Sequence, residues 1–123
     1  MLIISSFNVE KDEFCRHMNR DYRNSYSQSG LERIYQDIKE HEKQNLQLIF
    51  RAVDIAIDYE EDCYQEFLDS INVSVVAHSD EELEQIISEY FEKDAPDKTF
   101  LAFTAEKTVV YKRRSVSGYV TIL

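Results

Sequence analysis

The side chains of this sequence that could do chemistry are mostly carboxylates, and one group of them is regularly spaced. Asp54, Asp58, Glu61, Asp62 and Asp69 lie at i, i+4, i+7, i+8 and i+15. On a helix, this spacing places all five on one stripe. No Lys or Arg stands four residues from any of them. Such a stripe could hold a metal cation, exchange protons or attract a basic protein.

A second group of carboxylates extends the acidity. Glu81, Glu84 and Glu89 lie on the solvent side of another expected helix. Residues 54–97 carry 15 of the chain's 24 acidic residues and a single base, Lys93. That window has a formal charge of −14, whereas the remaining residues carry +4. Segregated charge of this size predicts a docking surface for a basic protein partner; the other interpretation is a solvated face that keeps the domain soluble.

Tyrosines among these acids could anchor such an interface, as tyrosine often does. Tyr64 continues an apolar helical stripe, so we expect it in the core, whereas Tyr59 points away from the stripe and is the better contact. The predicted partner-binding residues are Asp54, Asp58, Tyr59, Glu61, Asp62, Asp69, Glu81, Glu84 and Glu89.

Metal binding and catalysis are weaker interpretations of the same residues. A calcium loop needs a glycine that this segment lacks, and a carboxylate acid/base pair needs a defined cleft. The run His78-Ser79-Asp80 holds the residue types of a catalytic triad, but Ser79 is better explained as a helix cap. We therefore predict no catalytic residue, no cofactor and no metal site.

Neither the cysteines nor the basic residues form a recognisable metal-binding or nucleic-acid-binding motif. Cys15 and Cys63 form no CxxC motif, which favours reduced thiols in the cytoplasm. Arg16, Arg20 and Arg23 form one basic cluster, and residues 112–114 (KRR) form another. Clusters this small would give few phosphate contacts, so direct nucleic-acid binding is not expected. We expect them to pair with the chain's own acids or to protect a sheet edge.

The elements that must position these residues follow from periodicity. We expect a strand at Leu2–Phe7, a helix capped by Asn8 with Phe14, Met18 and Tyr22 on its apolar face, and an exposed loop over Asn24–Gly30. From Leu31 to Ile71 a helical pattern continues without Gly or Pro, giving one helix or two with a break near Lys43–Asn45. A rival interpretation makes Leu46–Ile57 a buried strand.

The second half of the chain predicts strands around one helix. Val73–Ala77 predicts a strand, and Ser79 to Glu82 has the form of a capping box that begins a helix ended by Pro96. Phe100–Thr104, Thr108–Lys112 and Gly118–Leu123 predict a three-stranded antiparallel meander. The fold class is therefore α+β, in the order β-α-α(α)-β-α-β-β-β, with helices packed on one face of a mostly antiparallel sheet.

Size and hydropathy bound the function. The chain of 123 residues is expected to form a single α+β domain over residues 1–123, with no membrane span. In length and charge it resembles small acidic inhibitors such as immunity proteins and antitoxins. We predict a non-enzymatic inhibitor of a basic toxin or nuclease, in an oligomeric state that the sequence leaves open. The alternatives are a phage-encoded nucleic-acid mimic that blocks a host defence nuclease, and a small enzyme or ligand-binding domain with a helix–sheet pocket.

Overall fold

A computed structural model describes residues 10–43, 47–48, 52–74, 79–113 and 120–121, without the side chains of residues 41–43, 47–48, 54 and 120–121. The elements, in chain order, are α1 (Lys11–Asp21), α2 (Gln28–Lys43), β1 (Gln47–Leu48), α3 (Ala52–Asp58), β2 (Tyr59–Cys63), α4 (Tyr64–Ser70), α5 (Asp80–Lys93), β3 (Thr99–Phe103), β4 (Thr108–Lys112) and β5 (Val120–Thr121).

The main sheet is antiparallel and has three strands in the order β2-β4-β3. The hairpin of β3 and β4 is the one that the sequence predicts. Its third strand is not the predicted one, because β5 pairs with β1 in a separate two-stranded ladder. The place beside β4 is taken by β2, in the register Glu61 to Val110. The α+β class with an antiparallel sheet is therefore confirmed, and its strand partners are corrected.

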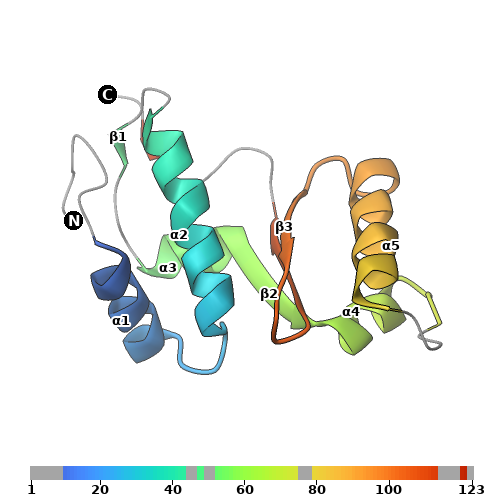
Figure 1. Cartoon of the computed structure of the whole chain (residues 1–123). Helices are drawn as coiled ribbons and strands as arrows, with labels where there is room; N and C mark the ends of the chain where they lie inside the picture. Colours follow the sequence, from blue (N-terminus) through green and yellow to red (C-terminus); the bar gives the residue numbers. More distant parts are fainter. Residues whose placement is uncertain (1–9, 44–46, 49–51, 75–78, 114–119, 122–123) are drawn as a thin grey trace.

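Helices cover both faces of this sheet rather than one (Figure 1). Side chains alternate along β4, so Val110 faces the core formed with α1, α2 and α3. Val109 and Tyr111 face the opposite core, formed with α4 and α5. The prediction of one covered face is wrong because β4 is apolar at consecutive positions, which is typical of a strand buried on both sides.

The first helix has the predicted apolar face. Phe14 and Met18 are both 0% exposed, and Tyr22 ends the helix as its C-cap. The helix begins after Glu10, which makes no side-chain capping hydrogen bond. Asn8 and the predicted strand at 2–7 lie outside the described residues.

The predicted helical run from Leu31 to Ile71 is broken by a strand. Helix α2 ends at Lys43, α3 spans only seven residues, and β2 then runs from Tyr59 to Cys63 before α4 begins. Helix α2 ends at Lys43, as the predicted break near Lys43–Asn45 requires, but the part after the break is not one helix. Of the rival strand predicted at 46–57, β1 covers Gln47–Leu48 and residues 52–57 are helical; the rest of that range lies outside the described residues. The acidic run of β2 forms a strand because its side chains find hydrogen-bond donors on both faces of the sheet.

The turns around α2 and α4 also differ from prediction. Helix α2 begins at Gln28, inside the predicted loop. Helix α4 ends in a Schellman motif, in which Asn72 has a φ of 61° and the Val73 amide donates to the Leu68 carbonyl at 2.9 Å. This turn leaves Val73 and Ser74 outside any strand, and the rest of the strand predicted at 73–77 lies outside the described residues.

Helix α5 follows the sequence closely. Ser79 is its N-cap, and its side chain accepts a hydrogen bond from the Glu82 amide at 3.2 Å. Leu83, Ile87 and Phe91 are buried on the inner face, and stacking between Phe91 and Phe100, with ring centroids 5.5 Å apart, joins the helix to β3.

Candidate functional site

The structure separates the predicted partner-binding residues into internal and exposed groups. Asp58 is 1% exposed and Tyr59 is 0% exposed. The Tyr59 hydroxyl donates to Asp37 at 2.6 Å, and the Lys112 ammonium lies 2.9 Å from the same carboxylate. The prediction that these two residues form an exposed contact is wrong, because both are buried where α3 ends and β2 begins, and Tyr59 packs into the core shared with α2.

Glu61 is also used inside the molecule. Its carboxylate accepts hydrogen bonds from the Ser27 amide at 2.8 Å, from the Ser27 hydroxyl at 2.5 Å and from the Thr108 hydroxyl. Ser27 in turn caps α2, since its hydroxyl accepts from the Gly30 amide at 3.0 Å. Glu61 therefore ties the start of α2 to the sheet, and its carboxylate is used inside the molecule.

The opposite face of β2 carries a second network of carboxylates. The Tyr111 hydroxyl lies 2.6 Å from Glu60 Oε2 and 3.1 Å from Asp62 Oδ2. Burial raises the pKa of Asp62, and the neighbouring charge of Glu60 adds to the rise. For Glu60, burial opposes ionisation, but hydrogen bonds from Arg113 and Tyr111 outweigh it and lower the pKa. Asp62 is partly exposed, yet it belongs to this structural network.

The remaining predicted residues lie on the surface. Asp69 on α4 and Glu81, Glu84 and Glu89 on α5 are all exposed. Asp54 belongs to α3, and its side chain is outside the described set. The acidic surface is therefore carried by α4 and α5, which pack on the same core at one end of the molecule (Figure 1).

The outer face of α5 is almost wholly acidic. Six of its eight exposed residues are Asp or Glu, the others being Gln85 and Lys93. Residues 64–97 contain ten acids and one base. In the described part of the chain, an ion pair on this face joins Lys107 to Asp80 at 2.8 Å. We call the exposed carboxylates of α4 and α5 the acidic face.

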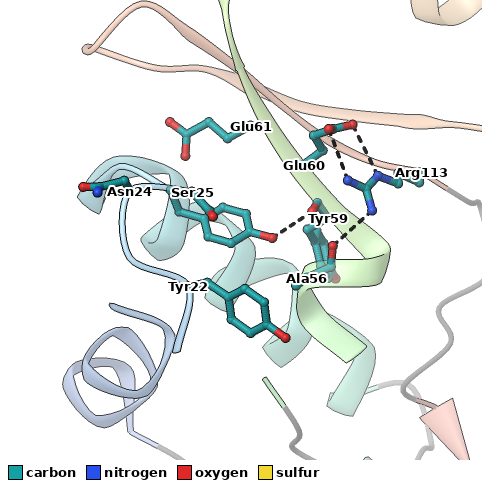
Figure 2. A pocket seen from close by; sticks show the side chains of 9 residues that line it. Tyr22, Asn24, Ser25, Ala56, Tyr59, Glu60, Glu61 and Arg113 are labelled. Atoms are coloured by element: carbon teal, nitrogen blue, oxygen red, sulfur yellow. Dashed lines mark hydrogen bonds and ion pairs between the residues drawn. The ribbon is translucent and has the colours of Figure 1, made fainter. Parts of the chain in front are cut away.

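A polar hollow of about 400 Å³ lies on the other side of the sheet, between the α1–α2 connection, α3 and β2 (Figure 2). Arg113 reaches into it, but its guanidinium already contacts Glu60 at 3.1 Å and the carbonyls of Ala56 and Ile57 at 3.1 and 2.8 Å. Burial raises the pKa of Tyr26 to about 12, and its hydroxyl donates to the Tyr59 carbonyl at 2.9 Å. These groups are engaged with one another, which leaves little to recognise a ligand.

The other candidate chemical groups lie apart. Cys15 is 5% exposed, and burial raises the pKa of its thiol, which keeps it protonated and unreactive. His78 and the side chain of His41 are outside the described set. Within the described residues, no three His, Cys, Asp or Glu side chains are grouped to hold a metal ion.

The basic clusters pair largely as expected. Arg16 lies 3.9 Å from Glu13, and Arg20 lies 3.0 Å from Asp21. Arg113 pairs with Glu60, and Lys112 with Asp37. The sequence did not predict Asp37, Glu60 or Tyr111 as interaction partners of these charged residues. The available signal was the set of charged residues between apolar strands, because a charged residue must find a partner when it is buried.

Comparison with known proteins adds no evidence about the function of this chain. The chain matches no protein-family model, no curated protein and no solved structure. Among the helices described, none combines the length and apolar character needed to cross a bilayer.

Proposed function

We propose that this chain is a non-enzymatic protein-binding inhibitor, of the immunity-protein or antitoxin kind, that holds a basic toxin or nuclease through its acidic face. The observation that carries the proposal is the composition of α5, on which six of eight exposed residues are carboxylates. A helix needs no such bias for folding, because like charges along it repel by a few tenths of a kcal/mol per pair.

The mechanism follows from electrostatics. A concentrated negative field raises the rate at which a positively charged protein arrives in the correct orientation. The binding residues are Asp69, Glu81, Glu84 and Glu89, with the surrounding acids of α4 and α5. Asp58, Tyr59 and Glu61 act instead inside the fold, so their substitution would disturb stability before binding. A cytoplasmic location remains part of this proposal.

The test begins by capturing partners from cell extract at low ionic strength on immobilised chain. The captured protein is then purified, and its association rate is measured against salt concentration. The double variant Glu84→Gln, Glu89→Gln should slow association about tenfold and flatten its salt dependence. The matched control is Glu13→Gln, Glu32→Gln, which removes the same charge from exposed positions on α1 and α2. Equal association rates for both variants would reject the proposal.

The nucleic-acid mimic is a second candidate that the same surface supports. A mimic would occupy the groove in which its target binds phosphates, so duplex DNA should compete with the chain for the captured protein. An inhibitor that binds elsewhere on a toxin would be unaffected by DNA. The hollow of Figure 2 supports the ligand-binding alternative less well, because the donors of Arg113 are already used.

A further inference from the structure

The acidic face is not flat, because three hollows lie along it. The first is on α4 and residues 73–74, the second is between residues 70–73 and α5, and the third is on the first half of α5 and its cap. Their volumes are about 490, 410 and 490 Å³. The first and second share Val73, and the second and third share Ile86. Adjacent hollows therefore meet at these residues, and we call the three together the α4–α5 trough.

The floor of the α4–α5 trough is apolar. Ile71, Val73, Ile86 and Tyr90 line it and are each only partly buried against the core beneath. The Tyr90 ring meets Phe67 edge-on, with centroids 5.8 Å apart, which fixes it to α4. Partly exposed side chains of this kind gain further burial when a partner covers them.

The position of Val73 is set by the turn after α4. Asn72 adopts the left-handed conformation, and its amide donates to the Asp69 carbonyl at 3.1 Å. The Schellman geometry folds Val73 back onto Leu68. The floor is therefore built from hydrogen-bonded backbone as well as from packed side chains.

The rim of the trough is acidic. Six of the residues that line it are carboxylates and one, Lys93, is a base; the acids are Glu66, Asp69, Glu81, Glu82, Glu89 and Asp94. An apolar floor between acidic edges complements a helix with one apolar stripe and Lys or Arg on both flanks. Helix α5 has 14 residues, so a partner helix of similar length would span the trough at about 1.5 Å per residue.

We propose that the α4–α5 trough binds a basic amphipathic helix of the partner protein. This inference rests on the proposed function and specifies the partner's docking element. Apolar side chains of that helix would lie against Ile86 and Val73, as in other complexes that seat a helix in a groove. Its Lys and Arg residues would face the rim, where charge pairs set orientation and rate.

The test uses a synthetic peptide of about 18 residues, roughly five helical turns, with Leu at i, i+3, i+4 and i+7 and Lys elsewhere. A second peptide carries Ala in place of every Leu and has the same charge. Binding to the full chain is measured by fluorescence anisotropy, and the contact surface is mapped by amide chemical shifts. The Leu peptide should bind at least tenfold more tightly than the Ala peptide and should shift Val73, Ile86 and Tyr90.

Variants then locate the site. Ile86→Ser should weaken binding of the Leu peptide about tenfold, and the nearly isosteric Val73→Thr should weaken it while keeping the fold, as checked by circular dichroism. The matched control is Ile57→Ser, which removes an apolar side chain that is 50% exposed on α3, away from the trough. Its affinity should equal that of the unmodified chain.

Three outcomes would overturn the inference: no binding of the Leu peptide at low salt, equal binding of both peptides, or an Ile57→Ser effect as large as that of Ile86→Ser. Equal binding of the two peptides, with loss in Glu84→Gln, Glu89→Gln, would show attraction by charge alone and would leave the proposed function standing. The capture experiment judges that function separately.

Discussion

At the scale of single residues, the carboxylates of this protein do two different kinds of work. Glu61 receives three hydrogen bonds inside the fold, whereas Glu84, an exposed residue on α5, faces solvent. Sequence spacing treats them alike, since both are acids in one charged window. The difference arises because a partly buried carboxylate needs donors, and β2 brings Glu61 to Ser27 and Thr108.

The close approach of Gly30 to Glu61 gives a first prediction. A Cβ built on Gly30 would collide with the Glu61 carboxylate. Alanine normally favours a helix over glycine by about 1 kcal/mol, yet we expect Gly30→Ala to lower the free energy of unfolding by about 1–3 kcal/mol through overpacking. Urea denaturation measures this change.

Removing the carboxylate isolates the cause. In a Glu61→Ala background, Gly30→Ala should have a much smaller effect, so a double-mutant cycle should show strong coupling. Additive effects of the two substitutions would mean that the collision is not the reason.

The Asp62 carboxylate gives a prediction about pH. Its pKa is raised in the folded state, first by burial and then by Glu60, so this group removes stability as pH rises through the folded pKa. Asp62→Asn keeps an acceptor for Tyr111 and should raise the free energy of unfolding at pH 7, by less than about 1 kcal/mol because solvent screens a partly exposed site. The gain should vanish below the ordinary aspartate pKa of 3.8.

Glu60 serves as a control, because its pKa shifts in the opposite direction to that of Asp62. Its pKa is lowered in the folded state, so its stabilisation is present above the ordinary glutamate pKa of 4.5 and is lost as pH falls through the folded pKa. Glu60→Gln should therefore destabilise the chain at pH 7. A loss of stability in Asp62→Asn at that pH would contradict the raised pKa of Asp62 in the folded state.

At the scale of elements, the predictions that rest on neighbouring residues, such as a helix cap, an apolar helix face or a hairpin, are confirmed. The Ser79 cap, the α5 core face and the β3–β4 hairpin are all present. The long helix failed because β2 follows α3 and precedes α4 with no turn signal. Apolar residues of short helices on either side of a strand can fall in phase with a 3.6-residue period by chance.

The end of α4 gives an element-scale prediction. Asn72 has a φ of 61°, a conformation that Gly adopts without strain and that Ala adopts at about 1 kcal/mol. Asn72→Gly should keep or slightly raise the melting temperature, whereas Asn72→Ala should lower it. Differential scanning calorimetry of both variants tests this. Equal destabilisation by Gly and Ala would show that the Asn side chain, rather than its backbone, maintains the turn.

At the scale of the whole molecule, charge is divided between two halves that share one sheet. Residues 64–97 contain ten acids and one base, and they include both helices that cover one face of that sheet. Repulsion within this half opposes folding and is screened by salt. Like charges therefore repel one another at the surface that we propose for binding, and this repulsion lowers the stability of the fold.

This repulsion gives a whole-molecule prediction. Raising NaCl from about 20 to about 500 mM, which shortens the screening length severalfold, should raise the melting temperature of the chain. The variant Glu84→Lys, Glu89→Lys should melt at a higher temperature at low salt and depend less on salt. The control Glu13→Lys, Glu32→Lys, on α1 and α2, should show a smaller change. Equal salt slopes for all three proteins would contradict the division of charge.

Patterns in the amino-acid sequence were enough to predict the class of the fold, α5 with its cap, the β3–β4 hairpin and the concentration of acid in one window. Those features depend on neighbours in the chain, whose propensities and charges are local. The folded structure was needed to show which acids are exposed, that helices cover both faces of the sheet, and that hollows lie along α4 and α5. Such facts depend on which distant segments meet: Ser27 and Thr108 donate hydrogen bonds to Glu61, and the turn at Asn72 brings Val73 to the hollow that Ile86 also lines.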